Sequence, residues 1–200
     1  TLKNMGFAIN PYDPCVANCM IEGSQCTIAW YVDDTKISHV NPDVVTRVIE
    51  TLEGHFGKMT VTRGREHVFL GMKIKYNENQ TATITMKQYL EEALAECNMD
   101  INYEAATPAK RSLFDLDEQS ARLTMQEAEI FHSISAKLLY VAIRARMDIL
   151  LPVGFLGTRV SKCTKDDQDK LRRILEYIKG TMDEEYTIGA DTLHDLRTWV

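Results

Sequence analysis

Residues 27–38 constrain the fold of this chain more than any other stretch. Their sequence, Thr-Ile-Ala-Trp-Tyr-Val-Asp-Asp-Thr-Lys-Ile-Ser, places two adjacent acids, Asp33 and Asp34, between two runs of strand-forming residues. Such a pattern predicts a tight β-hairpin with both acids at its tip. Neighbouring side chains of a straight strand point to opposite faces, so the two carboxylates can share a ligand only if the chain turns there.

Two neighbouring carboxylates repel each other unless cations lie between them, and oxygen ligands of this kind suit Mg²⁺. The alternative is an ordinary solvated turn, because Asp is a common turn residue. The approach to the acids, residues 28–32, is a dense run of apolar and aromatic side chains. This run predicts a buried strand that delivers Asp33 and Asp34 into an interior cleft, and it favours a metal site over a solvated turn.

The composition is that of a globular protein. The chain has 200 residues, 44% of them hydrophobic, which is enough to bury one large core or two small ones. No apolar run approaches the ~20 residues of a membrane span, and no signal segment opens the sequence, so we expect a soluble intracellular protein without a membrane partner. The five cysteines form no Cys-x-x-Cys pair, which favours reduced core thiols over a zinc site at Cys15, Cys19, Cys26 and His39.

Charge is unevenly distributed along the chain. The formal net charge of −6 argues against a nucleic-acid partner, because phosphate contacts need Lys and Arg. However, residues 58–75 carry five basic against one acidic side chain, and residues 136–179 carry ten against five, whereas residues 91–129 carry three basic against ten acidic. This segregation is compatible with basic surfaces that follow a nucleic-acid backbone, and also with ordinary solvated charge.

The first part of the chain predicts an antiparallel meander followed by a helix. Residues 1–6 look like the last helical turn before Gly6, residues 15–21 like a strand, and residues 22–25 like the loop that leads into the strand before Asp33. A third strand is expected over residues 35–40. Asn41 and Pro42 are typical of a helix start, and Gly57 of its end. The apolar stripe of this helix comprises Val44, Val45, Val48, Ile49, Leu52 and Phe56.

The second part changes from strands to helices. Residues 68–76 predict a strand with one basic face, paired with residues 81–85, and a helix follows over residues 86–97. Residues 98–123 have the composition of a linker. Capping boxes begin two more helices, at Thr124–Glu127 and at Thr164–Asp167. The first is expected to run toward Met147 with Phe131, Ile134, Leu138 and Val141 inward, and the second to end at Gly180 with Leu171, Ile174, Leu175 and Ile178 buried. The predicted fold class is α+β.

Ordered landmarks along the chain resemble one protein family. Tyr31-Val32-Asp33-Asp34 resembles the YxDD box of reverse transcriptases, and Phe69-Leu70-Gly71 resembles their FLG segment. The order and spacing of these boxes are similar to those of copia-type LTR retrotransposon polymerases. Further landmarks of that family are matched by Gly6-Phe7, Asp13-Pro14-Cys15-Val16, Ala106-Thr107-Pro108, Leu138-Leu139-Tyr140 and Ile174–Thr181. The chain departs from the family at Ala145 and Met147, where threonine and proline are usual.

The resemblance implies part of an RNA-directed DNA polymerase within a Gag-Pol polyprotein. It divides the chain into the end of the palm with the primer-grip hairpin and the first thumb helix (1–97), a linker (98–123), a helical thumb and connection region (124–182) and the start of an RNase H-like region (183–200). The implied partners are an RNA or DNA template with its primer, deoxynucleoside triphosphates and the remaining Gag-Pol domains. The implied location is a cytoplasmic virus-like particle, with a nuclear stage; the oligomeric state stays open.

The resemblance also implies roles for individual residues. Asp33 and Asp34 would be catalytic and would hold two Mg²⁺ ions, for which Mn²⁺ could substitute. The residues that would contact the primer or nucleotide are Tyr31, Val32, Lys58, Phe69, Leu70, Gly71 and Met72. From the residues alone, Lys58 also fits an exposed loop lysine, and Gly71 a β-bulge. The family's third carboxylate would precede Thr1, so we expect the isolated chain to be inactive.

Two other functions are compatible with the sequence. The first is a decayed or domesticated retroelement that serves only in nucleic-acid binding or assembly. The second is an unrelated metal-dependent phosphohydrolase, which would need carboxylate or histidine ligands beyond Asp33 and Asp34.

Overall fold

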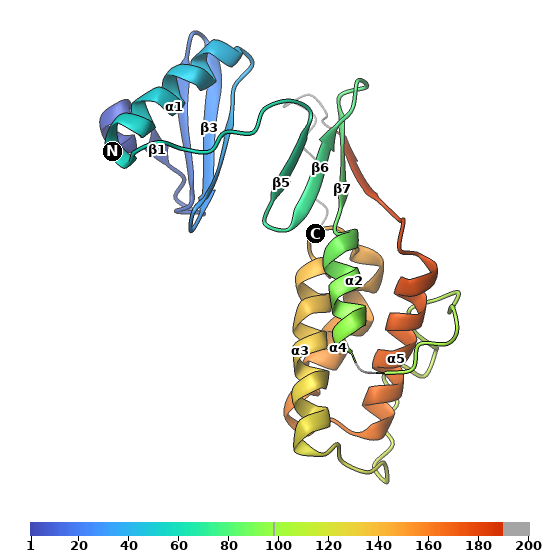
Figure 1. Ribbon diagram of the computed structural model, residues 1–200. Helices are drawn as coiled ribbons and strands as arrows, with labels where there is room; N and C mark the ends of the chain where they lie inside the picture. Colours follow the sequence, from blue (N-terminus) through green and yellow to red (C-terminus); the bar gives the residue numbers. More distant parts are fainter. Residues whose placement is uncertain (98, 190–200) are drawn as a thin grey trace. The chain divides into compact units, whose positions relative to one another are not determined.

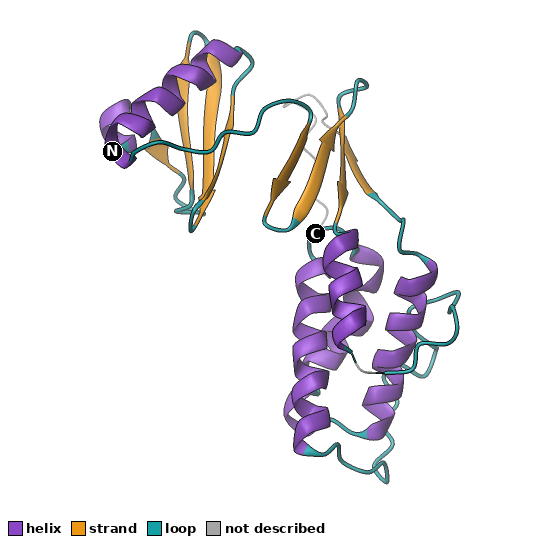
Figure 2. Cartoon of the chain, viewed as in Figure 1, coloured by secondary structure: helices purple, strands orange, loops and turns teal. Residues whose placement is uncertain are grey.

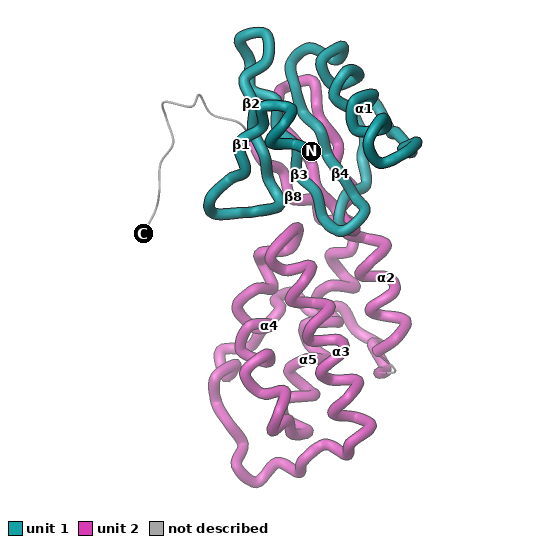
Figure 3. The backbone as a smooth tube through the Cα atoms, turned by 90° about the vertical axis from the view of Figure 1, so that its left-hand side faces the viewer, with its two compact units in different colours: residues 1–70 teal, residues 71–200 magenta. Residues whose placement is uncertain are grey.

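The computed structural model describes residues 1–97 and 99–189 (Figure 1). In this part of the chain the fold is α+β, as predicted, with two four-stranded sheets and five α-helices (Figure 2). The chain divides into two compact units, Thr1–Leu70 and Gly71–Val200 (Figure 3), and each is described by itself. The predicted domain divisions at residues 97, 123 and 182 stay predictions.

The first unit contains a meander with strand order β1-β2-β3-β4. A short 3₁₀ helix, η1 (Leu2–Met5), ends at Gly6 with a φ of 85°, so the expected helical turn is confirmed. The strands are β1 (Ala8–Ile9), β2 (Val16–Ile21), β3 (Ser24–Tyr31) and β4 (Asp34–Ser38), and the two-residue strand β1 was not predicted. The loop predicted over residues 22–25 is a tighter turn, since Glu22 and Gly23 alone take left-handed φ values.

Helix α1 (Pro42–Phe56) packs on one face of this meander. The side chain of Asn41 accepts a hydrogen bond from the backbone N–H of Asp43 at 2.9 Å, which confirms the predicted start. The shared core contains Phe7, Ala17, Cys26, Ile28, Val44, Val48 and Leu52. The prediction was wrong for Phe56, which is 72% exposed, because burial along α1 ends at Leu52.

The second sheet has the strand order β5-β6-β7-β8. Its strands are β5 (Glu66–Phe69), β6 (Met72–Tyr76), β7 (Thr81–Thr85) and β8 (Tyr186–Gly189). The single strand predicted over residues 68–76 was wrong, because Leu70 and Gly71 take left-handed φ values and separate β5 from β6. Strand β8 was not predicted; it pairs with β7 across a long stretch of sequence.

Four helices belong to the second unit: α2 (Lys87–Glu96), α3 (Met125–Ala142), α4 (Leu150–Gly157) and α5 (Lys165–Gly180), with short 3₁₀ turns η2 (Met147–Ile149) and η3 (Val160–Lys162). Both predicted capping boxes are present. The predicted inward residues of α3 and α5 are buried, namely Phe131, Ile134, Leu138, Val141, Leu171, Ile174, Leu175 and Ile178. Helix α4 was not predicted. It contains Pro152 in its first turn, where a missing N–H costs no hydrogen bond.

Helix α3 ends at Ala142, before the predicted Met147. The chain then turns inward at Arg146, which is 3% exposed. Its guanidinium donates to Asp148 at 2.8 Å and to the backbone oxygen of Thr181 at 3.0 Å, just beyond α5. A buried arginine requires such partners. This polar network therefore ties the end of α3 to the end of α5.

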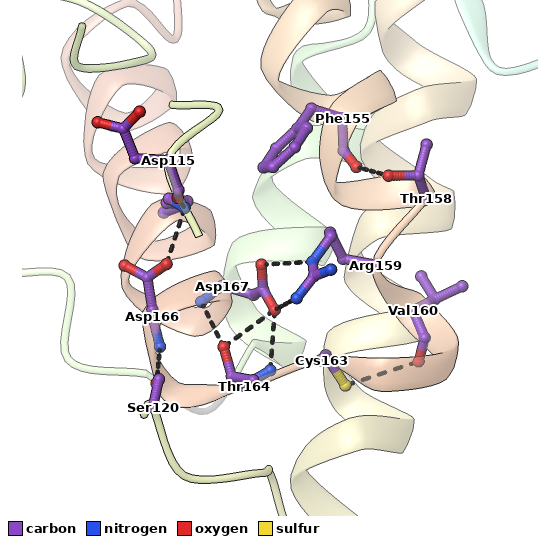
Figure 4. A network of polar contacts seen from close by, with 11 residues as sticks. Asp115, Ser120, Phe155, Thr158, Arg159, Val160, Cys163, Thr164, Asp166 and Asp167 are labelled. Carbon is purple, nitrogen blue, oxygen red and sulfur yellow. Dashed lines mark hydrogen bonds and ion pairs between the residues drawn. The ribbon is translucent and has the colours of Figure 1, made fainter. Parts of the chain in front are cut away.

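A buried ion pair holds the start of α5 (Figure 4). Asp167 is fully buried; its carboxylate accepts from Arg159 Nε at 3.1 Å and from the backbone N–H of Thr164 at 2.9 Å. The same carboxylate thus completes the capping box and neutralises Arg159.

The described residues of the predicted linker, 99–123, form no helix or strand but pack along α5. The backbone N–H of Ala105 donates to the carbonyl of Glu176 at 3.3 Å, and that of Leu123 to the carbonyl of Cys163 at 3.2 Å. The five cysteines are free, and Cys26, Cys97 and Cys163 are buried, as expected of core thiols. No helix among the described residues is long and apolar enough to cross a membrane. Part of the RNase H-like region predicted over residues 183–200 lies outside the described residues.

Candidate active site

The predicted hairpin at the paired acids is confirmed. Strands β3 and β4 pair in antiparallel register with Tyr31 opposite Asp34, so Val32 and Asp33 form a two-residue turn. Val32 takes a φ of 53°, in the left-handed region. A β-branched residue rarely adopts this conformation, because its side chain clashes with the backbone. Strained backbone of this kind tends to occur at functional sites, and here it lies next to the two acids.

The two carboxylates do not occupy equivalent positions. Asp33 is the second residue of the turn, whereas Asp34 is the first residue of β4. Residues that pair directly across antiparallel strands share a face, and the face alternates along each strand. Asp34 therefore shares a face with Tyr31 and Lys36, opposite to the face on which Ile28 packs into the core. Lys36 was not predicted as a neighbour of Asp34, although the alternation of side chains along β4 indicates it.

The acids are exposed, and the predicted buried approach was wrong. Ile28 is 1% exposed, but Tyr31 is 57% and Val32 87% exposed, and both Asp33 and Asp34 are exposed as well. Helix α1 covers only one face of the meander, so alternate residues of β3 are buried and Tyr31 points to the uncovered face. Within the first unit, the acids stand on a surface rather than in an interior cleft.

The predicted magnesium ligands fit part of a site. Carboxylate oxygens are the ligands that Mg²⁺ prefers, and both side chains at this turn are accessible. Within residues 1–97 and 99–189, no group of three or more His, Cys, Asp or Glu side chains could hold a metal ion. Asp13, the nearest aspartate upstream, accepts a hydrogen bond from the backbone N–H of Cys15 at 2.9 Å and belongs to a turn. The described residues therefore offer Asp33 and Asp34 without a third such side chain beside them, and the magnesium site stays a prediction.

Lys58 lies directly after α1, in a segment without helix or strand, and is exposed. This segment is held to α1 by Met59, whose backbone N–H donates to the carboxylate of Glu53 at 3.0 Å. The position agrees with an exposed loop lysine, and the role of Lys58 beside a nucleotide stays a prediction.

The predicted primer-contacting residues 69–72 form a tight turn between β5 and β6. Leu70 and Gly71 take φ values of 53° and 74°, so the segment is a turn and not the bulge that was the alternative for Gly71. A side chain at Gly71 would make only ordinary contact with Met86, at 3.5 Å, so the backbone conformation is what favours glycine here. The two compact units meet in sequence between Leu70 and Gly71, and a role for residues 69–72 beside Asp33 stays a prediction.

No family model matches the chain. The transposon Ty1-MR1 Gag-Pol polyprotein of Saccharomyces cerevisiae is 23% identical over 182 residues, which cover 84% of this chain and 10% of the polyprotein. A transposon Ty5-1 protein of the same yeast is 25% identical over 181 residues, covering 90% of this chain and 58% of that protein.

The chain resembles retrotransposon proteins. The predicted family resemblance is confirmed at this level, and the chain spans about a tenth of the length of the Ty1 polyproteins that it matches. No solved structure matches. The similarity extends over most of the chain, so it includes parts of both compact units.

Proposed function

We propose that this chain is part of the RNA-directed DNA polymerase of a copia-type retrotransposon and adds deoxynucleotides to a primer 3′-OH. The observation that carries the proposal is the strained two-residue turn, which presents Asp33 and Asp34 together on an uncovered sheet face. The similarity to transposon Gag-Pol polyproteins supports it independently. The activity would belong to the longer protein, because two exposed carboxylates are an incomplete ligand set.

In this proposal Asp33 and Asp34 would hold two Mg²⁺ ions, for which Mn²⁺ could substitute. Metal ions at such a site lower the pKa of the attacking hydroxyl and neutralise charge on the transferring phosphate. Tyr31, on the same face as Asp34, and Val32, at the tip of the turn, support the primer terminus. Lys58 supplies positive charge to the leaving pyrophosphate. The turn at Phe69, Leu70, Gly71 and Met72 would approach the primer strand with the exposed Gly71, where no side chain keeps the strand away.

The proposed partners are an RNA or DNA template with its primer, deoxynucleoside triphosphates and the neighbouring Gag-Pol domains. The proposed location is a cytoplasmic virus-like particle with a nuclear stage. A binding or assembly module is the second candidate, which is favoured by the exposure of Asp33 and Asp34 without a third carboxylate among the described residues.

The decisive experiment is primer extension by the full-length polyprotein's polymerase region on oligo(dT)-primed poly(rA). Asp33→Asn and Asp34→Asn should each lower magnesium-dependent synthesis by about 100-fold or more, because each removes a metal ligand. Asp13→Asn is the matched control, since asparagine can still accept the hydrogen bond from Cys15. Equal synthesis by Asp33→Asn and the parent would refute the proposal and favour the binding module.

The isolated 200-residue chain should show no synthesis in the same assay. Magnesium-dependent extension by this chain alone would show that Asp33 and Asp34 suffice, contrary to the proposal. Phosphate release or nuclease activity without primer and deoxynucleotides would instead favour the phosphohydrolase.

A further inference from the structure

Residues 99–123, here called the strap, run along helix α5 in the opposite direction to it. Ser120 accepts from the backbone N–H of Asp166 at the start of the helix, as Figure 4 shows. Toward the end of the helix, α5 contacts progressively earlier residues of the strap. The carbonyl of Asp115 accepts from Lys170, the hydroxyl of Thr107 from Arg173, and the carbonyl of Ile101 from Lys179. The strap thus follows α5 along its length, from its first turn to its last.

The strap is held by little apolar burial. Leu113, 5% exposed, is the one buried residue between positions 99 and 123. Phe114 lies edge-on to the ring of Phe155, with centroids 5.4 Å apart, but is itself 59% exposed. The hydrogen bonds that Lys170, Arg173 and Lys179 donate to the strap lie at the surface. Segments with few buried contacts and exposed hydrogen bonds open at low free-energy cost.

The strap covers the most basic part of α5. Residues 170–180 contain Lys170, Arg172, Arg173 and Lys179 against one acid, Glu176. The strap acceptors are neutral oxygens: the carbonyl of Ile101 lies 2.8 Å from Lys179 Nζ, and the hydroxyl of Thr107 lies 2.9 Å from Arg173 Nη2. Neutral acceptors leave the charges of Arg173 and Lys179 uncompensated, whereas Lys170 also pairs with the carboxylate of Asp166 at 2.8 Å. An anionic acceptor would bind the same donors more strongly.

Arg173 is only partly satisfied under the strap. Its Nη2 donates to Thr107, whereas its Nε is buried and has no hydrogen-bond partner. A buried donor without an acceptor costs free energy, because it has lost its water. The Nε and Nη2 edge of a guanidinium binds phosphate with two parallel hydrogen bonds. The strap therefore occupies half of an edge that suits a phosphate group.

We propose that the strap is a displaceable cover, and that the phosphate backbone of a nucleic-acid duplex replaces it on Lys170, Arg173 and Lys179. The kind of partner rests on the proposed function, but the displacement requires neither Asp33 nor catalysis. In the covered state α5 binds nucleic acid weakly. Once the strap has moved, the basic side chains of α5 bind phosphate oxygens in place of the neutral oxygens of the strap.

Hydrogen exchange of the whole 200-residue chain, with and without a saturating RNA–DNA hybrid, measures the displacement directly. The backbone N–H of Ala105, which donates to Glu176 at 3.3 Å, and its neighbours over residues 101–115 should exchange faster when the hybrid is bound. Unchanged or slower exchange there, with the hybrid bound, would mean that the strap stays in place and would overturn the proposal.

Variants of the strap provide an independent readout, the affinity for a labelled hybrid measured by fluorescence anisotropy. Thr107→Val removes the acceptor of Arg173 at an exposed position and should tighten binding by about two- to tenfold. Thr107→Ser keeps the hydroxyl and is the matched control. Leu113→Ser should also tighten binding, whereas Leu116→Ser, at a residue that is 51% exposed, should not.

Arg173→Gln tests the site itself. In the Thr107→Val background, Arg173→Gln should remove the gain in affinity. It should also reduce the slope of log affinity against log salt concentration by about one, the value for one lost phosphate contact. Arg172→Gln is the control of equal charge, because Arg172 pairs with Asp169 rather than with the strap. The proposal fails if Thr107→Val and Leu113→Ser bind no tighter than the parent, or if their gain survives Arg173→Gln. Primer extension by Asp33→Asn depends on neither result, so a failure here is separate from a failure of the proposed function.

Discussion

Tyr31 and Asp34 lie directly opposite each other on β3 and β4, and only Val32 and Asp33 connect them. This register decides how the paired acids are presented. One acid stands in the turn and the other begins a strand, on the face that α1 leaves uncovered. The register also forces Val32 into a left-handed conformation that valine disfavours.

Val32→Gly should therefore stabilise the first unit. Glycine adopts positive φ without strain, and Val32 is 87% exposed, so little burial is lost. We expect a gain of about 0.5–1 kcal/mol in the free energy of unfolding, which is the relieved strain less the entropy cost of glycine. Urea unfolding can be followed by Trp30 fluorescence after Trp199→Phe. Val40→Gly, at a valine that is 80% exposed and has no positive φ, should destabilise instead.

Gly71→Ala and Gly154→Ala should act in opposite directions. Gly71 has a φ of 74°, so alanine there should cost about 1–2 kcal/mol although its methyl group has room. Gly154 lies inside α4 with no atom within 4 Å of an added methyl group, so alanine there should add about 0.5–1 kcal/mol. Thermal unfolding followed by circular dichroism compares the two. Equal effects would contradict the conformational explanation.

Asp167→Ala should strongly destabilise the helical unit. The substitution leaves Arg159, whose side chain is 11% exposed, without its partner and removes the capping carboxylate of α5. The expected loss is about 3–5 kcal/mol in denaturant unfolding. Asp169→Ala on the same helix is the control: its carboxylate is 65% exposed in its pair with Arg172, and the loss should stay below about 1 kcal/mol.

Glu127 should make the helical unit sensitive to acid. The hydrogen bond from Lys165, together with those from Thr124, lowers the pKa of the Glu127 carboxyl from 4.5 to about 2. A carboxyl whose pKa is lower in the folded than in the unfolded state contributes stability above the unfolded pKa, and that contribution is lost as the pH falls.

The Glu127 contribution should therefore be complete above pH 4.5 and disappear as the pH approaches about 2. Glu127→Gln should flatten the dependence of the melting temperature on pH across this window. Glu129→Gln, at an exposed residue of the same helix, is the control that removes the same charge. An unchanged slope in Glu127→Gln would count against the predicted role of this carboxyl.

The features that were predicted correctly from sequence depend on neighbours along the chain. Asn41, Thr124 and Thr164 begin helices because each side chain bonds to a backbone N–H two or three residues later. The hairpin at Asp33 and Asp34 likewise follows from the residues on either side of the turn. Such signals are complete within a few positions, so a single sequence contains them.

The features that were missed depend on partners far away in the chain. Strand β8 forms by pairing with β7, with Thr187 opposite Thr83. Residues 99–123 lie along α5 because Arg173 and Lys179 donate hydrogen bonds to them. The exposure of Tyr31 was predicted wrongly for a related reason. An apolar run does not reveal whether one face of a sheet is covered or both. The candidate acids were found from sequence, whereas their surroundings were not.

Strands β7 and β8 are neighbours in the sheet, although helices α2 to α5 lie between them in the sequence. Register partners Thr83 and Thr187 are separated by about a hundred residues, so the sheet can close only after the ribosome has released all of the helices. The β7–β8 pairing therefore holds together the two ends of the segment that contains these helices. A protease that nicks the chain between α2 and α3 should therefore yield two fragments that stay associated and migrate as one particle until they are denatured.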